Sequence, residues 1–302
     1  MELTQQQFDV LVEIEQDQEN KHTQRQLSKK LKLSLGVVNK IINLLVSEKL
    51  IIAKPSSHFV VTKKGYEILE PYRVQRAIFI AAGFGERLMP ITLNTPKPLI
   101  RVKGKRMIDT LLDACKKAEI EEIYIVRGYL KEQFDSLLSK YPNIQFVDNP
   151  LYNEASNIAS AYFVKEHLQN AYVLEGDLLL YNTNLIRKYE YQSNYLAKKV
   201  EMTDDWCFEV KSGIIQSIKI GGKECYHMYG ISYWTNKDGM QLAKDIDEIF
   251  HQPGGKEKFW DVIPTRDFKD HYKISIREVE NDDIIEIDTF NELKAIDPAY
   301  RV

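Results

Sequence analysis

Apolar residues recur every three or four positions in the first part of the chain, a spacing that predicts amphipathic helices. The first helix is expected around Phe8 and Leu11, and the second over residues 23–31, with Thr23 as its N-terminal cap. A third helix is expected over residues 35–49. Its apolar face would consist of Val38, Ile41, Ile42 and Leu45.

Two short apolar runs follow these helices, at residues 50–52 and 58–62, with a turn expected at residues 55–57. Three helices and a hairpin in this order resemble the small winged helix-turn-helix domains of bacterial transcription regulators. We therefore predict a separate domain over residues 1–72. The resemblance implies a DNA partner, but the polar face of the third helix is only weakly basic. A DNA-binding surface, a solvated surface and a homodimer contact all stay open.

Strands and helices alternate from residue 77 onward. The expected strands are 77–82, 122–126, 144–147 and 171–175, and the expected helices are 107–118, 130–138 and 156–166. This alternation predicts an α/β fold with a Rossmann-like, mostly parallel sheet and helices on both faces. Beyond Asp177 the pattern changes to aromatic-rich strands, with one more helix at about 237–250. We expect residues 73–302 to form the second domain.

Composition sets limits on the class of protein. The chain of 302 residues is 44% hydrophobic and 28% charged, as in an ordinary globular protein long enough for two domains. A net charge of -3 argues against nucleic-acid binding along the whole chain. The three cysteines form no CxxC pair, and the sequence contains no signal-peptide core and no apolar run of membrane-spanning length. We expect a cytoplasmic protein without a membrane partner.

A strand that ends in a glycine-rich loop is the most informative stretch of the sequence. Gly83 and Gly85 follow the apolar run, then Arg87, and then Lys97 between two prolines. Glycines let backbone N–H groups approach an anion closely, while arginine and lysine add positive charge for phosphates. A Walker loop is excluded because Gly-Lys-Ser/Thr is absent, and a dinucleotide fingerprint because Leu88 occupies the position of its third glycine.

The order of strand, Ala-Ala-Gly-x-Gly-x-Arg and Pro-Lys resembles the signature of nucleotidyltransferases of the sugar-nucleotide pyrophosphorylase superfamily. The resemblance implies that a nucleoside triphosphate binds at this loop. The sequence departs from the pattern at Glu86, where many members carry Ser or Thr. We expect the Glu86 carboxylate to point away from the phosphates or to pair with a base.

Two other predicted strands end in an aspartate. They are Val-Leu-Glu-Gly-Asp, which ends at Asp177, and Ile-Ile-Glu-Ile-Asp, which ends at Asp288. A carboxylate at the carboxyl end of a strand can hold Mg²⁺ against phosphate oxygens. The superfamily resemblance implies that both aspartates bind Mg²⁺, with Glu286 as an additional candidate on the same strand face.

The second half of the chain narrows the resemblance to the bacterial CTP:phosphocholine cytidylyltransferases, through segments 149–152, 156–160, 230–235, 259–264 and 286–288. The resemblance implies conversion of CTP and phosphocholine to CDP-choline and pyrophosphate by in-line attack. The implied catalytic residues are Arg87, Lys97, Asp177 and Asp288. The implied nucleotide-binding residues are Ala82, Gly83, Gly85, Arg87, Lys97, Gly128, Tyr129 and Asn157.

The choline group of the implied acceptor is a quaternary ammonium, which cannot donate an N–H hydrogen bond and is recognised by aromatic faces and carboxylates. The substrate-binding candidates are Trp206, Tyr233, Trp260 and Asp261. Strand alternation puts Tyr233 and Trp234 on opposite faces, so only one of these two is expected to reach the acceptor. Each aromatic side chain could instead pack the sheet.

Two other functions stay open from the sequence. One is a nucleotidyltransferase that acts on a sugar-1-phosphate, phosphoethanolamine or a phosphonate. The other is a DNA-binding regulator whose second domain only senses a nucleotide. The intact set of Arg87, Lys97, Asp177 and Asp288 argues against a mere sensor.

Overall fold

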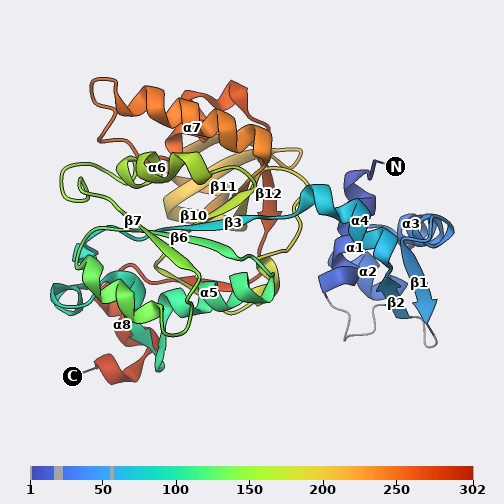
Figure 1. The fold of residues 1–302 in the computed structure, drawn as a ribbon, viewed down its shortest axis with the longest axis horizontal. Coiled ribbons are helices and arrows are strands. Elements are labelled where there is room, and N and C mark those ends of the chain that lie inside the picture. Colours follow the sequence, from blue (N-terminus) through green and yellow to red (C-terminus); the bar gives the residue numbers. More distant parts are fainter. Residues whose placement is uncertain (1, 17–22, 55–57, 302) are drawn as a thin grey trace. The chain divides into compact units, whose positions relative to one another are not determined.

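The computed structural model describes residues 2–16, 23–54 and 58–301, and the chain forms two compact units (Figure 1). Unit 1 comprises Met1–Arg73 together with Tyr189–Tyr191. Unit 2 comprises Val74–Lys188 and Gln192–Val302. The first boundary lies one residue from the expected one, and the return of residues 189–191 to unit 1 was not foreseen.

Unit 1 has the element order of a winged helix-turn-helix, as predicted. Its elements are α1 Gln5–Gln16, α2 Gln24–Lys30, α3 Leu35–Ser47, β1 Ile51–Lys54, β2 His58–Val61 and α4 Lys63–Leu69. Thr23 caps α2 in a reciprocal capping box with Gln26, which explains why the helix begins there. The turn expected at 55–57 lies outside the described residues. Helix α4 was not predicted, although Thr62 caps it in the usual way.

The core of unit 1 contains side chains from a distant part of the sequence. Tyr189 is fully buried there, and the ring of Tyr191 stacks on Tyr72 with centroids 5.5 Å apart. Phe8 lies 5.0 Å from Tyr72 and 5.3 Å from Tyr191 between ring centroids. The hydroxyl of Tyr191 also donates to the carbonyl of Leu3 at 3.1 Å. The winged-helix core is therefore completed by a segment that follows it by more than a hundred residues.

Unit 2 is built on a seven-stranded sheet with the strand order β10-β12-β11-β8-β3-β6-β7. The strands are β3 Arg76–Ile80, β6 Glu122–Arg127, β7 Ile144–Asp148, β8 Ala171–Glu175, β10 Asn194–Lys211, β11 Ile214–Trp234 and β12 Ser275–Glu278. Strands β8, β3, β6 and β7 pair in parallel, as predicted. Strand β11 runs antiparallel to β8 and forms a long hairpin with β10.

Helices cover both faces of this sheet, as predicted: α6 and α7 lie on one face and α5 on the other (Figure 1). The helices of unit 2 are α5 Met107–Lys117, α6 Ile158–Val164, α7 Asn236–Phe250 and α8 Phe290–Ile296. Successive side chains of β3 point to opposite faces of the sheet and contribute to the hydrophobic core on each face. Ala77 and Phe79 pack in the core with α5, whereas Ile78 packs in the core with α6 and α7. The helix expected at 130–138 is a 3₁₀ helix, Lys131–Leu137.

Two small antiparallel pairs complete unit 2. They are β4 Arg101–Val102 with β5 Lys105–Arg106, and β9 Leu178–Leu180 with β13 Ile284–Glu286. Over the ranges that the structure describes, none of the helices combines the length and the apolar character needed to cross a membrane.

Candidate active site

The two glycines in the loop after β3 have different surroundings. Gly85 has φ +72°, a left-handed conformation that favours glycine, and a Cβ there would lie 3.1 Å from Cβ of Lys97. Gly83 is different, because a Cβ there would meet no described atom within 4 Å. The carbonyl of Ala82 accepts a hydrogen bond from the backbone N–H of Tyr129 at 3.0 Å. The two loops expected to bind the nucleotide are therefore adjacent.

The loop that contains Gly128 and Tyr129 is tightly packed. A Cβ at Gly128 would lie 2.5 Å from Cβ of Tyr152, so a larger residue would clash. The hydroxyl of Tyr129 donates to the carbonyl of Thr92 at 2.9 Å. This hydrogen bond ties the loop to the segment between Gly85 and Lys97.

The four predicted catalytic residues form one hydrogen-bonded cluster. Lys97 Nζ donates to Asp177 Oδ2 at 2.7 Å and to Asp288 Oδ1 at 2.9 Å. Arg87 Nη2 donates to the same Asp288 oxygen at 2.8 Å. The Lys97 side chain is only 11% exposed, whereas that of Arg87 is 68% exposed. Arg87 thus lies at the exposed edge of the cluster, whereas Lys97 is enclosed with its two carboxylate partners.

Local strand pairing explains why Asp177 and Asp288 meet. Asp177 lies between β8 and β9, and Asp288 lies two residues after β13. Because β9 pairs antiparallel with β13, with Leu178 opposite Glu286, the two aspartates are brought to the same end of this small sheet.

The charge of Lys97 is stabilised by its two partners. Burial by itself lowers the pKa of Lys97, but the charge of Asp177 and then that of Asp288 outweigh burial and raise it above the ordinary value. Lys97 is therefore a permanent cation at physiological pH. Oδ1 of Asp177 is buried and has no hydrogen-bond partner in the described part of the chain, so this carboxylate retains a free ligand atom.

A group of carboxylates beside this cluster could hold a metal ion. Asp205, Glu286 and Asp288 each place one ligand oxygen within 4.8 Å of the others. Burial raises the pKa of Glu286, as do the charges of Asp177 and Asp288, against the lowering effect of His227. A set of carboxylate oxygens fits a hard divalent cation such as Mg²⁺. Asp205 was not among the predicted ligands.

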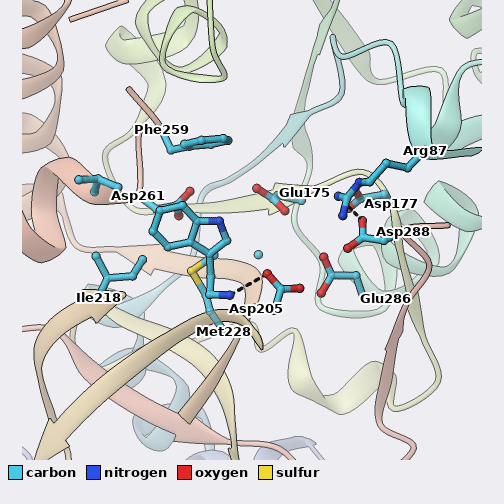
Figure 2. A pocket seen from close by; sticks show the side chains of 13 residues that line it. Arg87, Glu175, Asp177, Asp205, Ile218, Met228, Phe259, Asp261, Glu286 and Asp288 are labelled. Carbon is cyan, nitrogen blue, oxygen red and sulfur yellow. Dashed lines mark hydrogen bonds and ion pairs between the residues drawn. The ribbon is translucent and has the colours of Figure 1, made fainter. Parts of the chain in front are cut away.

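The cluster opens into a cavity of about 210 Å³ (Figure 2). Its lining consists of Arg87, Glu175, Asp177, Asp205, Trp206, Ile218, Met228, Gly230, Phe259, Asp261, Val262, Glu286 and Asp288. The rings of Trp206 and Phe259 lie 5.6 Å apart between centroids at an interplanar angle of 62°. The cavity thus combines carboxylates with an aromatic pair.

Asp261 is a buried carboxylate of this cavity, with 4% of the residue exposed. Its Oδ1 accepts a hydrogen bond from the hydroxyl of Tyr195 at 2.8 Å. Burial raises the pKa of Asp261 to about 7, although the hydrogen bond from Tyr195 opposes the shift. Its charge therefore changes near neutral pH.

Two of the predicted acceptor residues do not line the cavity. Trp260 is 2% exposed and its ring lies parallel to that of Tyr195 in the core on the α6 and α7 face. Tyr233 is 2% exposed and packs edge-on against Tyr172 in the core on the α5 face. Trp234 is also buried, so the expectation that either Tyr233 or Trp234 reaches the acceptor is not supported. These aromatic residues pack the sheet.

Asn157, a predicted nucleotide contact, has an internal role. Its side-chain oxygen accepts the backbone N–H of Trp260 at 2.9 Å, which positions the segment that leads to Asp261. This hydrogen bond gives Asn157 a role within the fold.

Sequence reasoning missed three polar or aromatic residues that line the cavity: Glu175, Asp205 and Phe259. Glu175 had a detectable signal, since it ends the same strand that leads to Asp177. Asp205 and Phe259 had none, because their position depends on how the β10–β11 hairpin and the 259–264 segment fold back over the sheet.

Known protein families match parts of both units of the chain. The model of the nucleotidyl transferase family matches residues 76–208, and a winged helix-turn-helix model matches residues 5–78. The chain is 37% identical over 228 residues to the 2-aminoethylphosphonate cytidylyltransferase of Lancefieldella rimae, covering 74% of this chain and 92% of that protein. It is 32% identical over 224 residues to the choline-phosphate cytidylyltransferase of Streptococcus pneumoniae, covering 74% and 96%.

A solved structure shows the same similarity. The structure of the CTP:phosphocholine cytidylyltransferase from Streptococcus pneumoniae matches with a TM-score of 0.70 and 32% identity, over 75% of this chain and 99% of that one. The similarity covers nearly all of that protein but only three quarters of this chain, which has a winged-helix domain in addition. This chain belongs to the cytidylyltransferases of the nucleotidyl transferase family, of the choline-phosphate cytidylyltransferase type, and carries an N-terminal winged helix-turn-helix domain.

Proposed function

We propose that the protein transfers CMP from CTP to phosphocholine and releases pyrophosphate. The observation that carries the proposal is the position of the cavity: it adjoins Lys97, Asp177 and Asp288 and is lined by carboxylates and an aromatic pair. A phosphate placed at the cationic cluster would leave the other end of a small acceptor in a negatively charged pocket. An ammonium group satisfies such a pocket, whereas a neutral sugar does not.

The glycine loop and the cations would hold the nucleotide. The amides at Gly83 and Gly85 and the exposed Arg87 would bind the departing pyrophosphate. Lys97 would face the α-phosphate, where negative charge grows as the acceptor oxygen attacks in line. The adjacent loops at Ala82 and Tyr129 would enclose the cytosine.

Mg²⁺ would be held by Asp177 and Asp288, with Asp205 and Glu286 within reach of Asp288. The free oxygen of Asp177 supports this assignment. When bound, the ion would add positive charge against the phosphate oxygens. Lys97 would then exchange one carboxylate partner for a phosphate oxygen and keep its own proton.

The acceptor's ammonium would lie against Trp206 and Asp261. A quaternary ammonium is attracted by an aromatic face and a nearby carboxylate, without an N–H hydrogen bond. The apolar side chains of Ile218, Met228 and Val262 supply surface for its methyl groups.

A second acceptor, 2-aminoethylphosphonate, is favoured by the number of carboxylates in the cavity. Glu175, Asp205, Asp261 and Glu286 could accept the N–H hydrogen bonds that a primary ammonium donates and choline does not. The relative from Lancefieldella rimae carries that acceptor in its name.

Turnover with a panel of substrates tests the proposal. Pyrophosphate release would be measured with CTP, UTP and dTTP, each with phosphocholine, phosphoethanolamine, 2-aminoethylphosphonate and glucose-1-phosphate. We expect the highest kcat/KM with CTP and phosphocholine, followed by 2-aminoethylphosphonate. The highest kcat/KM with glucose-1-phosphate would overturn the proposed acceptor class, and the highest with UTP would overturn the nucleotide.

DNA binding by unit 1 is a separate proposal, favoured by the exposure of Asn39, Lys40 and Asn43 on α3. In winged helix-turn-helix domains such a helix can enter the major groove. Fluorescence anisotropy with labelled duplex DNA would test it. Affinity should fall steeply between about 50 and 200 mM salt if lysines contact phosphates. Equal affinity at both salt concentrations, or none, contradicts DNA binding through phosphates.

A further inference from the structure

Glu175 shares in the proposed binding of a primary ammonium but has no role yet with phosphocholine, although its carboxylate faces the cavity (Figure 2). It is the last residue of β8, two positions before Asp177. Among the described residues none donates a hydrogen bond to it, and none forms an ion pair with it. A carboxylate that lines a cavity without a partner needs an explanation, because desolvating an unpaired charge is costly.

Gly230 on β11 makes room for this carboxylate. Strands β8 and β11 pair antiparallel, with Leu174 opposite Ile231, which brings Gly230 alongside Glu175. A Cβ at Gly230 would lie 2.5 Å from Cγ and 2.6 Å from Cδ and Oε2 of Glu175. Any other residue would therefore push the carboxylate out of its place. The φ of Gly230 is not in the left-handed range, so space is the reason for glycine here.

The charges around Glu175 are mostly negative. Asp177, Asp261 and Glu286 line the same cavity. Of these, Asp177 is paired with Lys97 and is proposed to hold Mg²⁺ together with Asp288. Among the described residues none forms an ion pair with Glu175 or Asp261, so a cationic group of the acceptor would complement these two carboxylates.

We propose that Glu175 is a specificity-determining residue: its carboxylate, held against Gly230, selects acceptors that carry a positive charge at the end remote from the phosphate. The inference rests on the proposed function, because it assumes that the cavity receives the acceptor. With a quaternary ammonium the contact is a charge interaction alone. With a primary ammonium Glu175 also accepts an N–H hydrogen bond.

The test compares two acceptors of the same shape and different charge. Phosphocholine and its neutral carbon isostere, 3,3-dimethylbutyl phosphate, present the same phosphate and nearly the same volume. The ratio of their kcat/KM values isolates recognition of the charge. In Glu175→Gln we expect this ratio to fall about tenfold from its wild-type value, by loss of one nearby charge. The same ratio is measured for 2-aminoethylphosphonate and propylphosphonate, which has a methyl group in place of the ammonium group.

Glu209→Gln is the matched control. Glu209 is exposed on β10, pairs with Lys219 and does not line the cavity. This control should leave the ratio unchanged. A Glu175→Gln variant that slows both acceptors equally would overturn the inference, since a role in folding, in metal binding or at the phosphate affects both alike.

Folding is not expected to obscure the result, because Glu175→Gln removes one of several mutually repelling carboxylates. A second variant, Gly230→Ala, keeps the charge of Glu175 but displaces it. Its ratio should also fall, and an unchanged ratio in this variant would overturn the inference as well. A wild-type enzyme that shows no preference for the charged acceptor refutes the proposed function itself. A wild-type preference that survives in Glu175→Gln refutes only the role of Glu175.

Discussion

Lys97 and Asp177 form an ion pair with 2.7 Å between Nζ and Oδ2, although 80 positions separate them in the sequence. The same ammonium binds Asp288, so one cation joins the two carboxylates that are proposed to hold Mg²⁺. Lys97 thus offsets the repulsion between them. This arrangement places the phosphate-binding cation and the candidate metal ligands within one hydrogen bond of each other.

Replacing Lys97 should impair the chemical step more than CTP binding. We expect Lys97→Ala to lower kcat about 100-fold or more, because the charge opposite Lys97 grows in the transition state. Steady-state kinetics with CTP as the varied substrate would measure kcat and KM separately. Lys140→Ala, which removes a surface lysine paired with Asp113, is the control. An effect confined to KM for CTP would assign Lys97 to ground-state binding alone.

Loss of either aspartate should abolish most of the activity. Asp177→Ala and Asp288→Ala are each expected to lower kcat about 100-fold or more, since a metal ligand contributes several kcal/mol to the transition state. Titration of activity with Mg²⁺ would check the cause, with Asp270→Asn on the exposed surface as the control. Wild-type rates of both variants in limiting Mg²⁺ would refute the assignment. Circular dichroism would establish that the variants are folded.

The preference for a charged acceptor should depend on pH through Asp261. Its pKa is raised to about 7, so the carboxylate is ionised above this pH and loses its charge as the pH falls. The fixed positive charge of phosphocholine lowers its second phosphate pKa relative to that of 3,3-dimethylbutyl phosphate, so the ratio of their kcat/KM values changes with pH for this reason alone. The ratio in the wild type is therefore divided, at each pH, by the ratio in Asp261→Asn, because the same two phosphates titrate in both measurements. This quotient should decrease from pH 8 to about pH 6, and a quotient that does not change with pH would contradict this role of Asp261.

Two tryptophans near the site should behave differently. Trp206 lines the cavity, so Trp206→Ala should raise KM for phosphocholine and leave KM for CTP unchanged. The expected loss of binding free energy is about 0.5–2 kcal/mol, for one cation–π contact. Trp206→Phe should restore part of the affinity. Trp260 is buried in the core, so Trp260→Ala should instead lower the free energy of unfolding by about 3–5 kcal/mol. Thermal melting and kinetics on both variants separate the two effects; a pure KM effect in Trp260→Ala would contradict its structural role.

A deletion of the winged-helix domain also affects residues 189–191, which belong to unit 1. We expect deletion of residues 1–72 to leave kcat nearly unchanged, because the nucleotide loop begins after them. The deletion should also expose Tyr189 and Tyr191, whose rings are packed in the core of unit 1, and so promote aggregation. The deletion combined with Tyr189→Ser and Tyr191→Ser should remain soluble, as gel filtration would show. A soluble but inactive protein would mean that unit 1 is needed for catalysis.

Local patterns in the sequence predicted most of the fold. The four apolar residues expected on the face of the third helix are the four buried residues of α3, since helical periodicity depends only on near neighbours. The strands of the parallel sheet were expected as well, because each short apolar run is a local feature and the alternation of strands with helices is typical of a parallel sheet.

Tertiary structure decided which residues share a site. The aromatic character of Trp260 and Tyr233 is plain in the sequence, but only the packing of the sheet determined that both are buried while Trp206 faces the cavity. The meeting of Asp177 with Asp288 depends on the pairing of β9 with β13, and the place of Tyr189 in unit 1 depends on a similarly distant contact. Contacts between residues far apart in the chain leave no periodic signal, because they are set by the packing of whole elements.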